Sequence, residues 1–105
     1  MTDIPARIER VQQMEARLNT LHDLVKSADH AVEALAAALP DFAQLFAYYY
    51  DVTWREDHAA DTRCEVPQDM PRGVLSKDAV WELMTTLREL SDRMTEVSEE
   101  ALRER

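Results

Sequence analysis

Apolar side chains recur every seven residues along the first third of the chain, in two interleaved rows. The first row holds Ile4, Val11, Leu18, Val25, Val32 and Leu39, and the second holds Met14, Leu21, Ala28 and Leu35. Rows with this offset occupy the a and d positions of a heptad repeat, which lie on one face of an α-helix. Because proline disfavours helical backbone at the residue before it, Pro40 ends the pattern. A long helix over about residues 5–39 is predicted.

A second apolar row occupies the last third of the chain, with alternating steps of three and four residues. Its members are Val80, Leu83, Leu87, Leu90, Met94, Val97 and Ala101. Ser76 is a favourable N-cap, and Leu75 is placed to pack on Val80 as a hydrophobic staple. The pattern predicts a helix over about residues 76–104.

The segment between these rows has a shorter run of regularly spaced apolar residues and is rich in aromatic residues. Phe42, Leu45, Phe46 and Tyr49 share one helical face, and Asp41 with Gln44 has the spacing of a capping box. A short helix over about 41–54 is predicted, followed by an ordered loop over 57–75. The fold class is therefore all-α, as a single domain over 1–105. We expect a long, antiparallel, coiled-coil-like hairpin capped by the aromatic helix and the loop.

A structural turn is expected just before the last helix. Gly73 suits a tight turn with positive φ, and Arg72 is placed to pair with Asp61 or Asp69. Together with the capping residue Ser76, Arg72 and Gly73 are predicted to have structural roles.

Composition and charge narrow the possible functions. The 105 residues include 12 basic and 21 acidic side chains, so the net charge is −9, which disfavours binding to nucleic acid and to anionic membranes. One glycine excludes the glycine-rich phosphate loops, and no cofactor is expected. One cysteine excludes an internal disulfide, and no membrane span is evident, so a cytoplasmic location is predicted.

The middle and last segments carry a pattern of short motifs. In order, they are Tyr48-Tyr49, Trp54-x-x-Asp57, Ala60-Asp61, Pro67-x-Asp69 and Arg72-Gly73-Val74-Leu75-Ser76-x-Asp78-Ala79. This pattern resembles a family of small, uncharacterised bacterial helical proteins, a domain of unknown function. Ala59 and Thr62 stand where that family has acidic residues, and His58 stands where it has an aromatic one. The resemblance implies a small helical protein and no particular activity.

The leading functional hypothesis is a non-enzymatic helical protein that binds other proteins. A two-helix arm leaves its apolar row half exposed, and a second copy would cover it, so a homodimer is expected. Tyr and Trp are enriched in protein interfaces. Contact with another protein is therefore assigned to an aromatic set: Tyr48, Tyr50, Trp54 and Trp81.

Two alternatives remain open at the level of sequence. The acidic balance suits a regulator or inhibitor that neutralises a basic partner. An acidic stretch suits a divalent-cation site, for which the candidate ligands are Asp57, His58, Asp61 and Glu65. Neither EF-hand spacing nor an HExxH pair accompanies these residues, and no catalytic set of side chains is evident.

Overall fold

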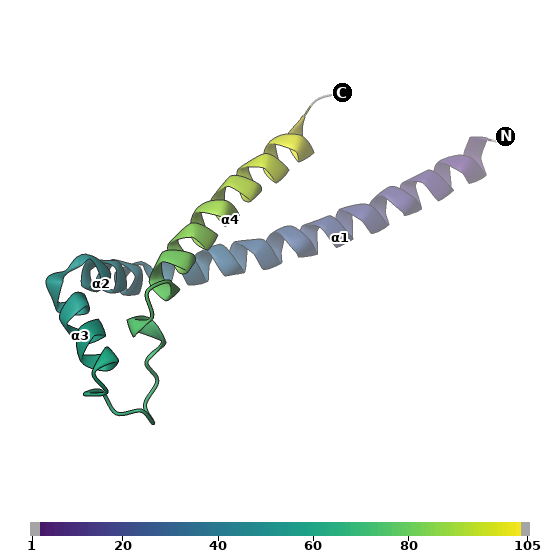
Figure 1. Ribbon diagram of the computed structural model, residues 1–105. Helices are drawn as coiled ribbons and strands as arrows, with labels where there is room; N and C mark the ends of the chain where they lie inside the picture. Colours follow the sequence, from purple (N-terminus) through teal and green to yellow (C-terminus); the bar gives the residue numbers. More distant parts are fainter. Residues whose placement is uncertain (1–2, 104–105) are drawn as a thin grey trace. The chain divides into compact units, whose positions relative to one another are not determined.

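A computed structural model describes residues 3–103 and is helical through most of that length. Within those residues it has four α-helices and one turn of 3-10 helix, and no strand. The elements are α1 (Asp3–Ala37), α2 (Leu39–Tyr50), α3 (Val52–Thr62), η1 (Gly73–Leu75) and α4 (Ala79–Leu102) (Figure 1). The predicted all-α class is confirmed.

The chain divides into two compact units, Met1–Asp41 and Phe42–Arg105. The N-terminal unit consists almost wholly of α1, drawn from purple to blue in Figure 1. A single helix has no second layer against which to bury a face. Consistent with this, every described side chain from Ile4 to Ala37 is exposed.

The first helix ends three residues before Pro40, at Ala37. The Ala38 N–H donates to the carbonyls of Ala34 and Leu35, both at 3.1 Å, which closes the last turn. A new helix begins at Leu39, so Pro40 stands in the first turn of α2, where its missing N–H is not needed.

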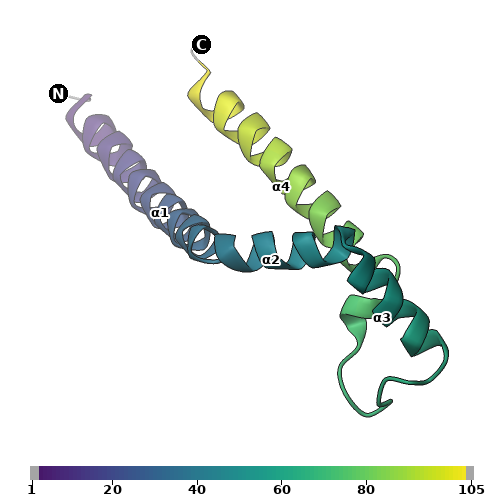
Figure 2. The same cartoon turned by 90° about the vertical axis from the view of Figure 1, so that its left-hand side faces the viewer.

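The predicted short helix over 41–54 is instead divided at Asp51. This residue has extended backbone (φ −88°, ψ 155°), and its carboxylate accepts a hydrogen bond from the Thr53 N–H at 3.2 Å. Asp51 is therefore the N-cap of α3, and this hydrogen bond lowers the pKa of its carboxyl group. Figure 2 shows the change of direction between α2 and α3 at this point.

The third helix continues to Thr62, through residues that were expected to form a loop. It ends in a Schellman-type arrangement of backbone hydrogen bonds. The Cys64 N–H donates to the Asp61 carbonyl, and the Glu65 N–H donates to the Ala60 carbonyl. Cys64 takes the left-handed position of that motif with φ 59°. Glycine usually fills this position, so the sequence carried no signal for the helix end.

The expectation of positive φ at Gly73 is wrong, because no described glycine has positive φ. Gly73 begins η1 with ordinary helical geometry, and a Cβ added there would meet nothing within 4 Å. Ser76 hydrogen-bonds to the start of α4, which is close to its predicted role as the N-cap. Its hydroxyl accepts the Ala79 N–H at 3.2 Å, although α4 begins at Ala79 rather than at Ser76.

A small core lies in the C-terminal unit, where η1 contacts both α3 and α4. Its members are Trp54 on α3, Leu75 on η1 and Val80 on α4, which are 8%, 6% and 3% exposed. These are the buried hydrophobic residues of the described chain. One side chain from each of three elements therefore closes the core.

Candidate interaction surfaces

A long uncovered apolar surface of the described residues is the heptad row of α1. Its large side chains are between 37% and 67% exposed, with Leu35 the least and Val25 the most exposed. They recur with the offset of the a and d positions, so they lie along one face of the helix. A row of this length and width is what a second helix would bury.

The apolar row of α4 is buried only at its first member. Val80 is 3% exposed, whereas Leu83 is 41%, Leu90 is 39%, Met94 is 45% and Val97 is 69% exposed. Leu87 is intermediate in exposure, so Val80 is the one residue of this row that belongs to the core. A shallow hollow of about 290 Å³ lies beside the middle of the helix, lined by Phe46, Met84, Leu87, Arg88, Ser91 and Asp92.

Two of the four predicted contact residues are prominently exposed. Tyr50 at the end of α2 is 68% exposed, and Trp81 in the first turn of α4 is 57% exposed. The Tyr50 hydroxyl lies 3.7 Å from the sulfur of Met84, and its ring meets Tyr49 edge-on with centroids 5.4 Å apart. Tyr50 is thus held over α4 while much of its ring remains available to solvent.

Trp54, by contrast, belongs to the core. Its indole N–H donates to the Val74 carbonyl at 2.8 Å. The ring stacks on His58 with centroids 5.0 Å apart and an interplanar angle of 6°, and it meets Tyr49 edge-on at 5.1 Å. These contacts use both the ring and its polar atom, so Trp54 supports the fold rather than offering a surface.

Tyr48, on α2, is half-buried. Its hydroxyl donates to Asp57 at 2.7 Å. Burial, this hydrogen bond and the negative charge of Asp57 raise the pKa of Tyr48 to about 12. The pair borders a cavity of about 260 Å³ that is otherwise apolar, with Val66, Met70, Pro71, Val74 and Leu75 in its lining.

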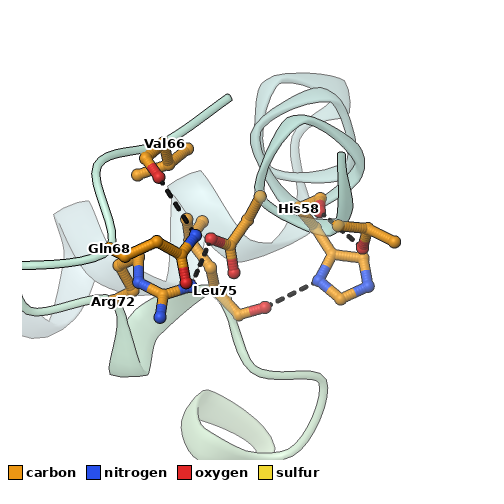
Figure 3. Close-up of polar contacts among 7 residues, drawn as sticks. His58, Val66, Gln68, Arg72 and Leu75 are labelled. Atoms are coloured by element: carbon orange, nitrogen blue, oxygen red, sulfur yellow. Dashed lines mark hydrogen bonds and ion pairs between the residues drawn. The ribbon is translucent and has the colours of Figure 1, made fainter. Parts of the chain in front are cut away.

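The four residues considered for a cation site each have another partner. Asp57 accepts from Tyr48, as described, and Nδ1 of His58 lies 2.6 Å from the Leu75 carbonyl (Figure 3). Asp61 pairs with Arg72 at 2.6 Å in a contact that is largely shielded from solvent. No group of three or more potential metal ligands occurs among residues 3–103.

Glu65, the last of these four residues, forms an ion pair with Arg63. The distance is 3.0 Å and both side chains are more than half exposed. The hydrogen bond and charge of Arg63 lower the pKa of Glu65. The neighbouring Gln68 amide donates to the Val66 carbonyl within the loop, over 3.3 Å (Figure 3).

Sequence reasoning missed the contacts that attach α3 to η1. The acceptors for Trp54 and His58 are backbone carbonyls 20 and 17 residues further along the chain. Any residue type supplies such a carbonyl, so the acceptor position leaves no trace in the sequence. Nothing in the sequence pattern indicated that Tyr48 pairs with Asp57.

Comparison with known protein families identifies the family to which the chain belongs. The family model described as a domain of unknown function (DUF4298) matches residues 11–97. The match spans most of the chain, so the protein belongs to this family. It includes most of α1, all of α2 and α3, and α4 to within its last two turns.

The other comparisons give no further relative. No curated protein and no solved structure shows a significant match. In the described part of the chain, none of the helices combines the length and the apolar character needed to cross a membrane.

Proposed function

We propose that this protein is a non-enzymatic helical interaction protein that self-associates as a homodimer and acts in the cytoplasm. The observation that carries the proposal is the exposed heptad row of α1, whose large apolar residues are all at least 37% exposed. Soluble monomers seldom leave so long an apolar surface uncovered, and such surfaces usually mark interaction sites. The single cysteine fits a reducing compartment.

The apolar rows of α1 and α4 have the same three-and-four spacing. In this proposal they face one another as an antiparallel, coiled-coil-like hairpin, and two hairpins combine into a four-helix dimer. The exposure of the α4 row beyond Val80 supports this arrangement, because Leu83, Leu90, Met94 and Val97 are each at least 39% exposed.

Self-association is tested by the mass of the full chain in solution. Light scattering after size-exclusion chromatography at tens of micromolar should give twice the chain mass of 12.1 kDa. A mass of one chain across that concentration range contradicts the proposal.

The second part of the proposal assigns contact with another protein to Tyr50 and Trp81. Both are exposed and aromatic, and residues of this type commonly dominate binding energies. Tyr48 and Trp54 serve mainly to support that surface, through their contacts with Asp57 and Val74.

Alanine variants separate a contact surface from simple packing. Tyr50→Ala and Trp81→Ala should reduce capture of a partner from cell extract by at least about tenfold, with little change in Tm. His22→Ala, on the exposed surface of α1, is the matched control and should leave capture unchanged. Equal losses of capture and of Tm would assign Tyr50 and Trp81 to packing alone.

A further inference from the structure

The heptad row of α1 shows the residue preferences of a specific kind of coiled coil. Position a holds Ile4, Val11, Leu18, Val25 and Val32, and position d from the second heptad on holds Met14, Leu21, Ala28 and Leu35. β-Branched residues at a combined with leucine at d favour two parallel helices. Four of the five a residues are β-branched, whereas the a positions of α4 are Val80, Leu87, Met94 and Ala101.

Helix lengths show why α4 of the same chain is not a sufficient cover. At a rise of about 1.5 Å per residue, the 35 residues of α1 span about 52 Å and the 24 residues of α4 span about 36 Å. Even a fully closed hairpin therefore leaves about three turns of α1 without a facing helix. Ile4, Ile8 and Val11 are 53%, 53% and 59% exposed.

The width of the apolar stripe on α1 also indicates that α4 is not its only partner. In its N-terminal half the stripe is flanked by Ile8 and by three charged residues, Arg10, Glu15 and Arg17, which favour a single neighbouring helix. In its C-terminal half the flanks are Leu24, Ala31 and Ala36, which leave room for a second neighbour. One partner along the N-terminal half and two along the C-terminal half is what a dimer of hairpins requires.

The charged residues beside the apolar stripe favour a parallel over an antiparallel partner helix. In a parallel pair, position g of one helix faces the following e position of the other, which places Arg10 opposite Glu15 of a second copy, twice by symmetry. In an antiparallel pair g faces g, and Arg10 and Arg17 would instead meet Leu24, Ala31 or Ala38. Neither Arg10 nor Glu15 has an ion-pair partner among the described residues.

We propose that a second copy of this chain covers the heptad row of α1, with the two α1 helices parallel and in register from Val11 onward. Arg7 occupies the d position of the first heptad and extends its charge to solvent, so the pairing is tightest beyond it. This inference rests on the proposed self-association and adds its surface and its direction.

Cysteine cross-linking tests the direction. The only native cysteine, Cys64, is exposed and is first replaced by serine. In that background, Val11→Cys should form a disulfide-linked dimer under mild oxidation, because equivalent a positions face each other in a parallel pair. Ala16→Cys, on the opposite side of the same helix, is the matched control and should cross-link far more slowly.

A mixture of Val11→Cys and Leu35→Cys chains detects the opposite direction. Preferential linkage between these two different chains would indicate an antiparallel pair and overturn the inference. A dimer in which Val11→Cys links no faster than Ala16→Cys would overturn it as well. In both cases, a dimeric mass of the unlinked protein would still support the proposed self-association. A monomeric mass would contradict the self-association and the parallel arrangement together.

Charge exchange provides an independent test. Arg10→Glu alone and Glu15→Arg alone should each weaken dimerisation roughly tenfold, since each places like charges opposite one another twice. The double variant should return to within about twofold of the original Kd. These two positions are five residues apart and do not adjoin on one helix, so recovery requires contact between copies. Failure of the double variant to recover contradicts the parallel register.

Discussion

The two units use apolar residues in similar periodic patterns and with opposite results. In α1 every large apolar side chain of the row remains at least 37% exposed. In the C-terminal unit, Trp54, Leu75 and Val80 come from three different elements and are each less than 9% exposed. Heptad spacing is thus sufficient to specify a helix, but burial requires a second layer, which only the C-terminal unit has within itself.

Polar contacts differ between the units in the same way. The described side-chain hydrogen bonds of α1 are local, such as Gln13 to Glu9 at 3.4 Å, and contacts of this kind contribute only tenths of a kcal/mol. In the C-terminal unit, Trp54 and His58 reach carbonyls of residues 74 and 75. Such long-range contacts fix the tertiary structure of the C-terminal unit, and the described side chains of α1 make no comparable contact.

The largest effect is expected for Trp54→Ala. Removing the indole leaves a cavity in the core and the Val74 carbonyl without its donor, so the free energy of unfolding should fall by about 3–5 kcal/mol. Urea denaturation followed by circular dichroism measures this loss. Trp81→Ala is the matched control, because Trp81 is 57% exposed and its loss should cost less than about 1 kcal/mol. Similar losses for the two variants would contradict the assigned core.

A charged residue in the middle of the α1 row should abolish association while sparing the C-terminal core. Val25→Asp is expected to raise the Kd of the dimer about a hundredfold or more, because the interface would bury a carboxylate. Sedimentation equilibrium gives this constant. Ala16→Asp introduces the same charge outside the row, and its Kd should stay within a few fold of the original. Unchanged association of Val25→Asp would show that the row is not the interface.

A smaller effect is expected for the Arg72–Asp61 ion pair. The atoms lie 2.6 Å apart and the side chains are 29% and 19% exposed, so Arg72→Ala should cost about 1–2 kcal/mol. Arg63→Ala breaks the Arg63–Glu65 pair, whose side chains are 59% and 56% exposed, and should cost less than about 0.5 kcal/mol. A double-mutant cycle with Asp61→Ala gives the coupling energy. Equal costs for the two arginines would remove the distinction between the pairs.

The last effect is confined to high pH and concerns Tyr48. Its pKa is raised from 10.0 to about 12, so folding favours the neutral phenol. The stabilisation is complete below pH 10 and is lost as the pH rises from about 10 to 12. Ultraviolet titration should show one of the three tyrosines ionising near pH 12, and Tyr48→Phe should eliminate that step. A late step that persists in the variant would assign it to another tyrosine.

The two long helices were predictable because their signals accumulate over many residues. The rows ending before Pro40 and beginning after Ser76 predicted α1 and α4 to within one helical turn at each end. Such rows specify which face of a helix is apolar, but they do not indicate which element packs against that face. For that reason the sequence supported a hairpin and a homodimer equally well.

The middle of the chain was predicted less well, because single residues decide its structure. Asp51 divides the predicted short helix by capping α3, and Cys64 takes the left-handed position usually filled by glycine. Gly73, the one residue expected to need positive φ, does not have it. The four candidate cation ligands instead contact other groups of the chain, such as Arg72 in the case of Asp61.

The helix α1 lacks a covering layer within its own unit, and we propose that a second copy supplies it. Amide hydrogen exchange of the full chain at low and at high protein concentration tests this arrangement directly. Protection of residues 4–37 should increase markedly with concentration, while protection around Trp54 and Val80 should remain constant. Protection of α1 that is high and independent of concentration would contradict the account.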